Sequence, residues 1–119
     1  MKNYLKEFPD FDNIEVFEEI EKRLSDCGFS DHSWHNDTNP SLQIHHGEKE
    51  VKVFVSYKEN DPDMNTTFVV FGYNWETCEE INLTETNDID DAVKSALESK
   101  EIIFKDDIEN NQSSNGPSI

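Results

Sequence analysis

The residues best suited to metal or acid–base chemistry are four histidines in two short segments of the chain. His32 and His35 lie in a polar stretch beside aspartates, and two imidazoles with a carboxylate are a set of ligands that zinc accepts. His45 and His46 are neighbours in a predicted strand, where consecutive side chains point to opposite faces. Because zinc needs convergent ligands with an ordered second shell, we interpret all four as loop and surface residues and expect no metal or other cofactor.

Three further motifs lack features that their chemistry requires. Asp61, Asp63 and Asn65 are spaced like the start of a calcium-binding EF-hand loop. Thr66 stands where that loop needs glycine, and Gly72 stands where it needs a bidentate glutamate. The chain also has only four glycines, none in a phosphate-binding loop, and no serine marks the strained turn of a hydrolase nucleophile. We therefore predict that the protein is not an enzyme.

The strongest signal in the sequence is a net charge of −17, from 27 acidic and 10 basic residues among 119. Like charge at this density destabilises a compact state by self-repulsion, so we expect a function that offsets the cost. A negative surface repels phosphate backbones and anionic lipids and attracts positively charged proteins. We expect a basic protein as partner, with no direct binding of nucleic acid or membrane.

The acidic residues gather on the first predicted helix and in the segment from Glu76 to Asp91, which contains no Lys or Arg. Two tryptophans stand in predicted turns, where an indole serves either as an interface anchor or, more commonly, as a cover for one end of the core. The first turn of the second predicted helix is acidic, and the helix dipole alone would also favour aspartates there. The predicted partner-binding residues are Glu15, Glu18, Glu19, Trp34, Trp75, Glu76, Glu79, Glu80, Glu85, Asp88, Asp90 and Asp91.

The first predicted element that carries some of these side chains is a helix from about Asn13 to Cys27. Its apolar residues recur at helical spacing and form one stripe. Asp12 is the expected N-cap, with Glu15 three residues later, and Gly28 supplies the left-handed residue after the helix.

The middle of the chain predicts an antiparallel sheet. Residues 42–45 and 51–57 alternate with a period of two around a turn at 46–49, which is typical of a hairpin. Residues 67–73 are apolar on both faces, as in a central strand, and residues 79–84 follow as its partner.

A second helix fits Asp88 to about Ser99, with Thr86 or Asn87 as its cap. Residues 101–104 either extend this helix or add a short edge strand. The predicted fold is α+β, an antiparallel sheet of three to four strands flanked by an N-terminal and a C-terminal helix on one face.

Residues 1–105 are expected to form a single acidic domain, and the polar residues 106–119 a disordered tail. Cys27 and Cys78 have no CxxC spacing, the start of the chain lacks an apolar secretory segment, and no apolar run is long enough to span a membrane. We expect a cytoplasmic protein, in the cytoplasm of the host cell if a phage encodes it.

Four functions remain open at this point. In size and charge the chain is similar to the small DNA-mimic inhibitors of phages and mobile elements, the anti-restriction and anti-CRISPR proteins, although no motif is shared. A second alternative is an immunity protein that neutralises a cationic nuclease toxin, with Trp34 or Trp75 as its anchor. A third is an acidic accessory domain, which could form a homodimer. A domain adapted to high salt is less consistent with the many Asn and Phe residues. We favour the inhibitor that occupies a nucleic-acid-binding surface.

Overall fold

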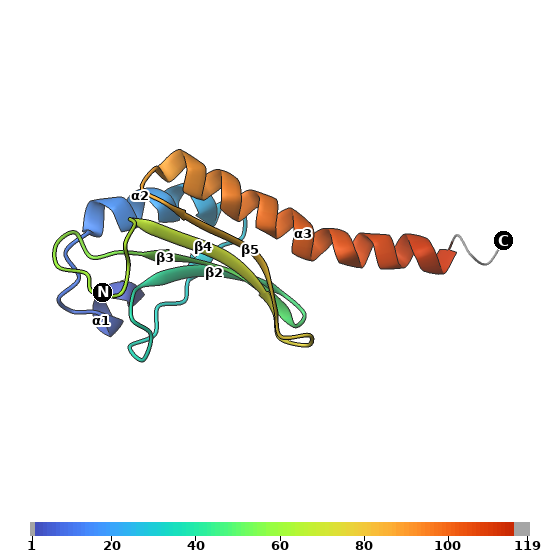
Figure 1. Cartoon of the computed structure of the whole chain (residues 1–119), viewed down its shortest axis with the longest axis horizontal. Coiled ribbons are helices and arrows are strands. Elements are labelled where there is room, and N and C mark those ends of the chain that lie inside the picture. Colours follow the sequence, from blue (N-terminus) through green and yellow to red (C-terminus); the bar gives the residue numbers. More distant parts are fainter. Residues whose placement is uncertain (1, 116–119) are drawn as a thin grey trace.

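A computed structural model describes residues 2–115, with side chains to residue 105, and it arranges this part of the chain around one antiparallel sheet (Figure 1). The strands follow one another in the order β1-β2-β3-β4-β5, and each neighbouring pair is antiparallel. In chain order the elements are α1 (Asn3–Glu7), α2 (Ile14–Ser25), β1 (Ser30–Asp31), β2 (Ser41–His46), β3 (Lys49–Val55), β4 (Phe68–Asn74), β5 (Glu79–Thr86) and α3 (Ile89–Asn115).

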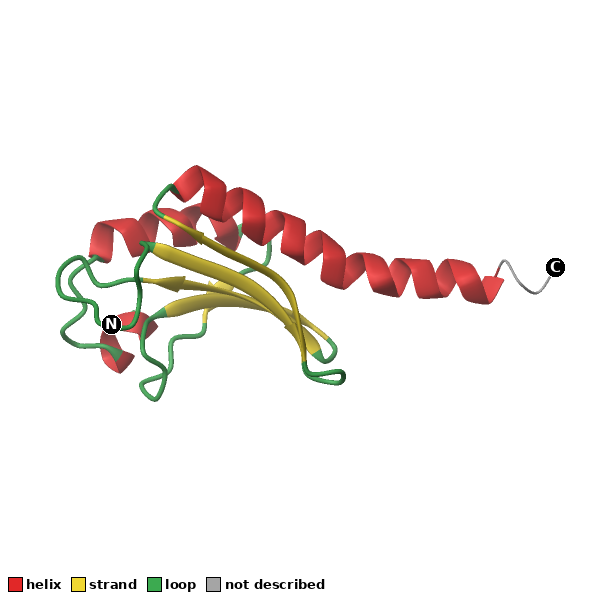
Figure 2. Cartoon of the chain, in the orientation of Figure 1, coloured by secondary structure: helices red, strands yellow, loops and turns green. Residues whose placement is uncertain are grey.

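The predicted α+β class is confirmed. Figure 2 shows α2 and α3 on the same side of the sheet, as expected for the N-terminal and C-terminal helices. The described sheet has five strands instead of three or four, because β1 is a two-residue strand that pairs with β2. The short helix α1 was also not expected, and residues 101–104 extend α3 instead of forming a strand.

The core lies between the sheet and these two helices. β2, β3 and β4 contribute residues such as Leu42, Val53 and Val70, which are fully buried. The helices contribute Phe17, Ile20, Leu24, Ala92, Ala96 and Ile103, also fully buried. Burying a side chain such as Val, Leu or Phe contributes about 1.5–3 kcal/mol, so this layer holds the helices against one face of the sheet.

The C-terminal end of α2 agrees with the sequence prediction, whereas its N-cap differs from it. Gly28 has a φ of 96°, which confirms the left-handed residue after the helix. Asn13, not Asp12, is the N-cap residue, and its side chain makes no capping hydrogen bond. The carboxylate of Asp12 instead accepts hydrogen bonds from the backbone N–H groups of Lys58 and Glu59, at 2.7 and 3.3 Å. The predicted cap thus binds a loop from beyond β3.

Both predicted hairpins are present, and their turns are connected. The β2–β3 turn contains Gly47 at φ 63°, and the backbone N–H of Trp75 in the β4–β5 turn donates to the carbonyl of Glu48 at 2.8 Å. The pairing of β4 with β5 is irregular after Gly72, whose missing Cβ would lie 3.0 Å from the Cβ of Ile81. Glycine at this position lets the two strands approach closely.

α3 is the longest helix and extends beyond the end of the sheet (Figure 1). It runs to Asn115, into the segment 106–119 for which the sequence predicts a disordered tail. The side chains from residue 106 and all of 116–119 lie outside the described residues, so the predicted domain boundary stays a prediction. None of the described helices combines the length and the apolar composition needed to cross a membrane.

Candidate protein-binding surfaces

All ten acidic residues of the predicted set have exposed side chains. They fall into three groups by the part of the fold that carries them. The helix acids are Glu15, Glu18 and Glu19; the cap acids are Asp88, Asp90 and Asp91; and the edge acids are Glu76, Glu79, Glu80 and Glu85.

The cap acids stabilise the start of α3. Asp88 is the residue before the helix, and its carboxylate accepts the backbone N–H of Asp90 at 2.8 Å, so Asp88 and not an earlier residue is the N-cap. Asp90 forms an ion pair with Arg23 of α2 and is the main cause of the raised pKa of that guanidinium. Asp91 lies 3.5 Å from the hydroxyl of Thr86, which donates to it. Local stability therefore accounts for these three positions.

The helix acids border an open groove of about 650 Å³ between α2, β1 and the N-terminal segment. Inside it, Glu18 accepts a hydrogen bond from the hydroxyl of Tyr4 at 2.9 Å. Tyr4 is fully buried and its ring stacks on Phe17 at 4.1 Å; burial, together with the bond to Glu18, raises the pKa of its hydroxyl. Glu18 thus helps to fix α1 against α2.

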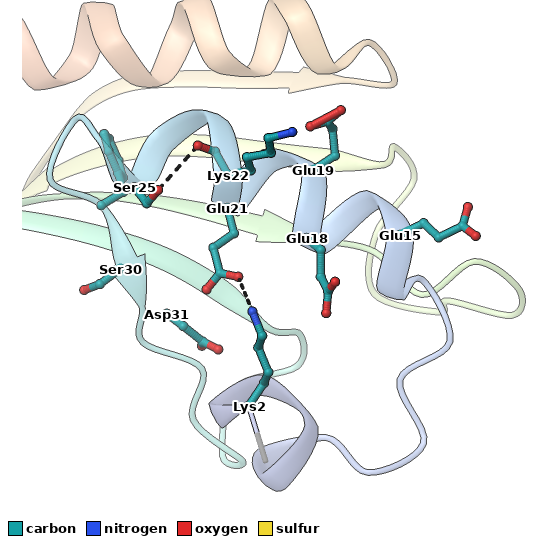
Figure 3. Close-up of a pocket in the computed structure, with 10 residues that line it drawn as sticks. Lys2, Glu15, Glu18, Glu19, Glu21, Lys22, Ser25, Ser30 and Asp31 are labelled. Carbon is teal, nitrogen blue, oxygen red and sulfur yellow. Dashed lines mark hydrogen bonds and ion pairs between the residues drawn. The ribbon is translucent and has the colours of Figure 1, made fainter.

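Other charges in this groove are also partly compensated. Lys2 lies 3.5 Å from Glu21, and Figure 3 shows this pair across the groove. Glu15 and Glu19 form no hydrogen bond or ion pair within the described residues, and Glu15 points away from the groove (Figure 3). Two of the three helix acids are therefore left with free carboxylates.

The edge acids have no structural task of this kind. None of their carboxylates makes a hydrogen bond or ion pair to the described part of the chain, and each is exposed. They lie on the β4–β5 turn and on β5, which is the last strand of the sheet. Charged side chains on an edge strand also oppose pairing with a further strand. These four carboxylates, with Glu15 and Glu19, are the predicted acids that remain available to a partner.

The two tryptophans are both about half exposed and neither belongs to the buried core. Trp75 is 59% exposed, its indole N–H donates to the carboxylate of Glu50, and its ring meets Tyr73 at 4.7 Å. Trp34 is 50% exposed and contacts only the ring of His35 among aromatic residues, in the loop before β2. Trp75 therefore lies on the turn that carries Glu76 and leads to Glu79 and Glu80, whereas Trp34 lies in the loop before β2.

The histidines are distributed over several surfaces. His45 meets the ring of His32 at 5.6 Å, while His46 stacks at 4.3 Å on a phenylalanine of α3, so the two neighbours do face opposite ways. His35 lies 2.9 Å from Glu7 and its hydrogen bonds lower the pKa of that carboxyl. Within the described residues, no three or more His, Cys, Asp or Glu side chains gather in a way that would hold a metal ion.

The calcium-like spacing around Asp61 has a local explanation. Its carboxylate accepts four hydrogen bonds, from the backbone N–H groups of Tyr57, Asp63 and Met64 and from the side-chain amide of Asn39. Burial alone would raise the pKa of Asp61, and these four bonds outweigh it and lower the pKa. Asp61 thus holds its own loop closed by accepting hydrogen bonds from groups of the protein.

One face of the sheet, which neither α2 nor α3 covers (Figure 2), was not predicted as a site from the sequence. We call it the open face, and its twelve positions are Ser41, Gln43, His45, Glu50, Lys52, Phe54, Val69, Phe71, Tyr73, Glu80, Leu83 and Glu85. Ser41 and Glu50 are buried by neighbouring groups, and the other ten are partly or fully exposed. The available signal was residues 67–73, apolar on both faces in a chain whose two predicted helices suffice for one face only. This pattern indicates a central strand, and a central strand needs cover on both faces.

The structure thus brings together five of the twelve predicted residues, namely Trp75 and the edge acids, on one hairpin. One helix acid and two cap acids lie elsewhere, near Arg23, whose pKa is raised by Asp90 and further by Glu19 and Asp88. Comparison with protein-family models, with curated proteins and with solved structures finds no match to this chain.

Proposed function

We propose that this protein is a non-enzymatic acidic inhibitor that occupies the basic nucleic-acid-binding surface of a DNA- or RNA-acting protein. Phage and mobile-element inhibitors of the anti-restriction and anti-CRISPR type would be proteins of the same kind. The observation that carries the proposal is a set of six exposed carboxylates that make no hydrogen bond or ion pair in the described chain. They are Glu15, Glu19 and the four edge acids.

Charge balance supports the proposal. Even if every Lys and Arg neutralised one acidic residue, 17 carboxylates would keep their charge. Duplex DNA carries about one negative charge per 1.7 Å of its axis, and a basic groove that binds DNA is built to accept such an array. Residues one turn apart on a helix have Cβ atoms about 5–6 Å from each other, so the likeness to DNA is one of sign and local density.

The same charge would determine how the complex forms. Complementary potentials raise association rates from about 10⁵–10⁶ M⁻¹s⁻¹ toward 10⁸–10⁹ M⁻¹s⁻¹ at low salt. Screening shortens the range of this attraction to about 8 Å at physiological ionic strength. Binding by this protein should therefore weaken steeply as salt is added.

One observation favours a second candidate, an immunity protein for a cationic nuclease toxin. Trp75 is 59% exposed and lies on the same hairpin as the edge acids, which is the arrangement of an aromatic anchor with an acidic surround. An immunity protein of this kind can bind beside the nucleic-acid site, whereas a DNA mimic binds within it. For either function we propose the cytoplasm as the location, consistent with two free cysteines, Cys27 and Cys78.

The experiment is a capture of binding proteins from a cell lysate, at about 50 mM and 500 mM NaCl. It uses the wild-type chain and a variant in which the edge acids are replaced by Gln. The matched control, of equal net charge, replaces four exposed acids whose side chains make no hydrogen bond to the described residues: Asp26→Asn, Glu59→Gln, Asp63→Asn and Glu101→Gln.

The proposal expects a nucleic-acid-binding protein that is captured at low salt, lost at high salt, lost with the edge variant and retained by the control. Displacement of that protein by duplex DNA would distinguish the DNA mimic from the immunity protein, which DNA would not displace. Equal capture by the edge variant and the control would contradict a role for these residues.

A further inference from the structure

The open face of the sheet carries an apolar centre that the fold leaves uncovered. Cross-strand pairing arranges its positions in three rows across β2, β3, β4 and β5. The rows are Ser41–Phe54–Val69–Glu85, Gln43–Lys52–Phe71–Leu83 and His45–Glu50–Tyr73–Glu80. Figure 2 shows α2 and α3 on the other side of the sheet, whereas α1 lies near one end of the sheet and packs on α2 through Tyr4 and Phe17.

The side chains in the centre of this face are accessible. Leu83 is 53% exposed, and Phe54, Phe71 and Tyr73 are partly exposed although they lie on strands inside the sheet. Phe54 and Phe71 are parallel, with 5.9 Å between ring centroids, and the ring of Trp75 extends the surface from Tyr73. Contiguous aromatic and aliphatic surface of this kind is typical of a protein-binding site.

The charge around this centre is negative. Glu80 and Glu85 lie on the open face itself, and the other two edge acids adjoin it on the β4–β5 turn and the first residue of β5. Lys52 is the one Lys or Arg among the twelve positions, and its Nζ lies 5.7 Å from the centroid of the Phe54 ring. The face therefore already holds one cation over an aromatic ring, and its rim would attract others.

A second copy of this chain fits the face poorly. Each copy carries a net charge of −17, and two open faces in contact would bring the carboxylates of Glu80 and Glu85 close to those of the other copy. Like charges in contact disfavour an interface, whereas a cationic partner gains from the same carboxylates. The charge thus selects a basic occupant.

We propose that the open face is the docking site of the partner, and that its occupant is a segment in which arginines alternate with apolar side chains. The apolar side chains contact Phe54, Phe71 and Leu83, while the guanidinium groups lie over aromatic rings or pair with Glu80 and Glu85. This inference rests on the proposed function, because it names the surface through which the inhibitor would bind.

The test uses a synthetic 12-residue peptide of alternating Arg and Leu as the probe, with an Arg–Ser peptide of the same charge for comparison. Binding to the full chain is followed by amide NMR shifts and by titration at low and physiological salt. The variants are Trp75→Ala with Leu83→Ser, and Leu83→Ser alone, because the loss of Trp75 leaves Glu50 without its indole partner. The matched control is Trp34→Ala with Ile102→Ser, which removes exposed apolar residues elsewhere.

The inference expects shifts centred on β3, β4 and β5, weaker binding of the Arg–Ser peptide, and at least a tenfold loss of affinity in the double variant, as for hot-spot truncations. Leu83→Ser alone should weaken binding in the same direction, and the control should bind as the wild type does. Shifts centred on α2, or equal binding of both peptides, would overturn the inference while leaving charge-driven inhibition intact. A dimer that Leu83→Ser dissociates would also overturn it, since a second copy would then occupy the face.

Discussion

Replacing the four edge acids by Gln should stabilise the fold, since their carboxylates repel one another and have no partner in the described chain. Gln keeps nearly the same shape, so the change isolates the charge. The loss in the free energy of unfolding that these four charges cause can therefore be measured. If binding requires them, the same substitutions should raise stability and abolish binding.

The size of the effect follows from the spacing of the residues. Two unit charges about 7 Å apart in water repel by about 0.6 kcal/mol. Glu79 and Glu80 are consecutive in β5 and point to opposite faces, and Glu76 lies across the turn, so these three carboxylates lie within about a Debye length of one another. Glu85 is five residues from Glu80 on β5. At about 3.3 Å per residue that separation is roughly 16 Å, beyond the Debye length at 0.15 M salt. We expect a total gain in the free energy of unfolding of about 1–2 kcal/mol at low salt.

The assay is urea unfolding of both proteins at about 20 mM and 500 mM NaCl, followed by circular dichroism. The gain should be present at low salt and nearly absent at high salt, because screening removes the repulsion that causes it. In thermal unfolding it should appear as a rise in Tm of about 4–8 °C at low salt.

A loss of stability on neutralisation would refute this reasoning, since it would mean that the edge acids support the fold. A gain that persists at high salt would refute it as well, because its cause would then not be charge. A cap acid is the contrasting case, since removal of its side chain should destabilise the protein.

Three further predictions concern the fold. Asp88→Ala should lower the free energy of unfolding in urea by about 1 kcal/mol through loss of the N-cap, and Asp88→Asn should not. Gly72→Ala should cost about 1–3 kcal/mol, since the new Cβ would lie 3.0 Å from that of Ile81, and an unchanged urea midpoint would contradict that contact. Burial and the hydrogen bond to Asp10 raise the pKa of Tyr57 to about 12, so its neutral form is favoured in the folded state. Its contribution to stability should be complete below about pH 10 and lost as the pH rises toward 12, a loss that Tyr57→Phe should reduce and that phenolate absorbance can follow.

The elements that the sequence predicted are those with a long periodic pattern. The apolar stripe of α2, the hairpin of β2 with β3 and the helical start of α3 are set by local spacing, which a single sequence displays. α1 and β1 have five and two residues, too few for a period to be recognised, and they exist because tertiary contacts hold them. The buried ring of Tyr4 provides such a contact for α1.

The sequence predicted that the acidic residues of the site are exposed, but not which of them make contacts within the fold. Charge alone indicated that the acids would be exposed, and all ten of the predicted acids are. Which of them serve the fold depends on partners remote in the sequence, such as Tyr4 for Glu18 and Arg23 for Asp90. The open face was missed for a related reason, because its accessibility depends on where α2 and α3 pack.

The most direct test of the central claim is a competition titration. The captured partner is bound to fluorescently labelled duplex DNA, and the wild-type chain is added while DNA anisotropy is measured. The proposed function predicts that the chain displaces the DNA completely, at a concentration that rises with salt, and that the edge variant displaces it far less. A complex in which the chain and the duplex are bound to the partner together would contradict the claim.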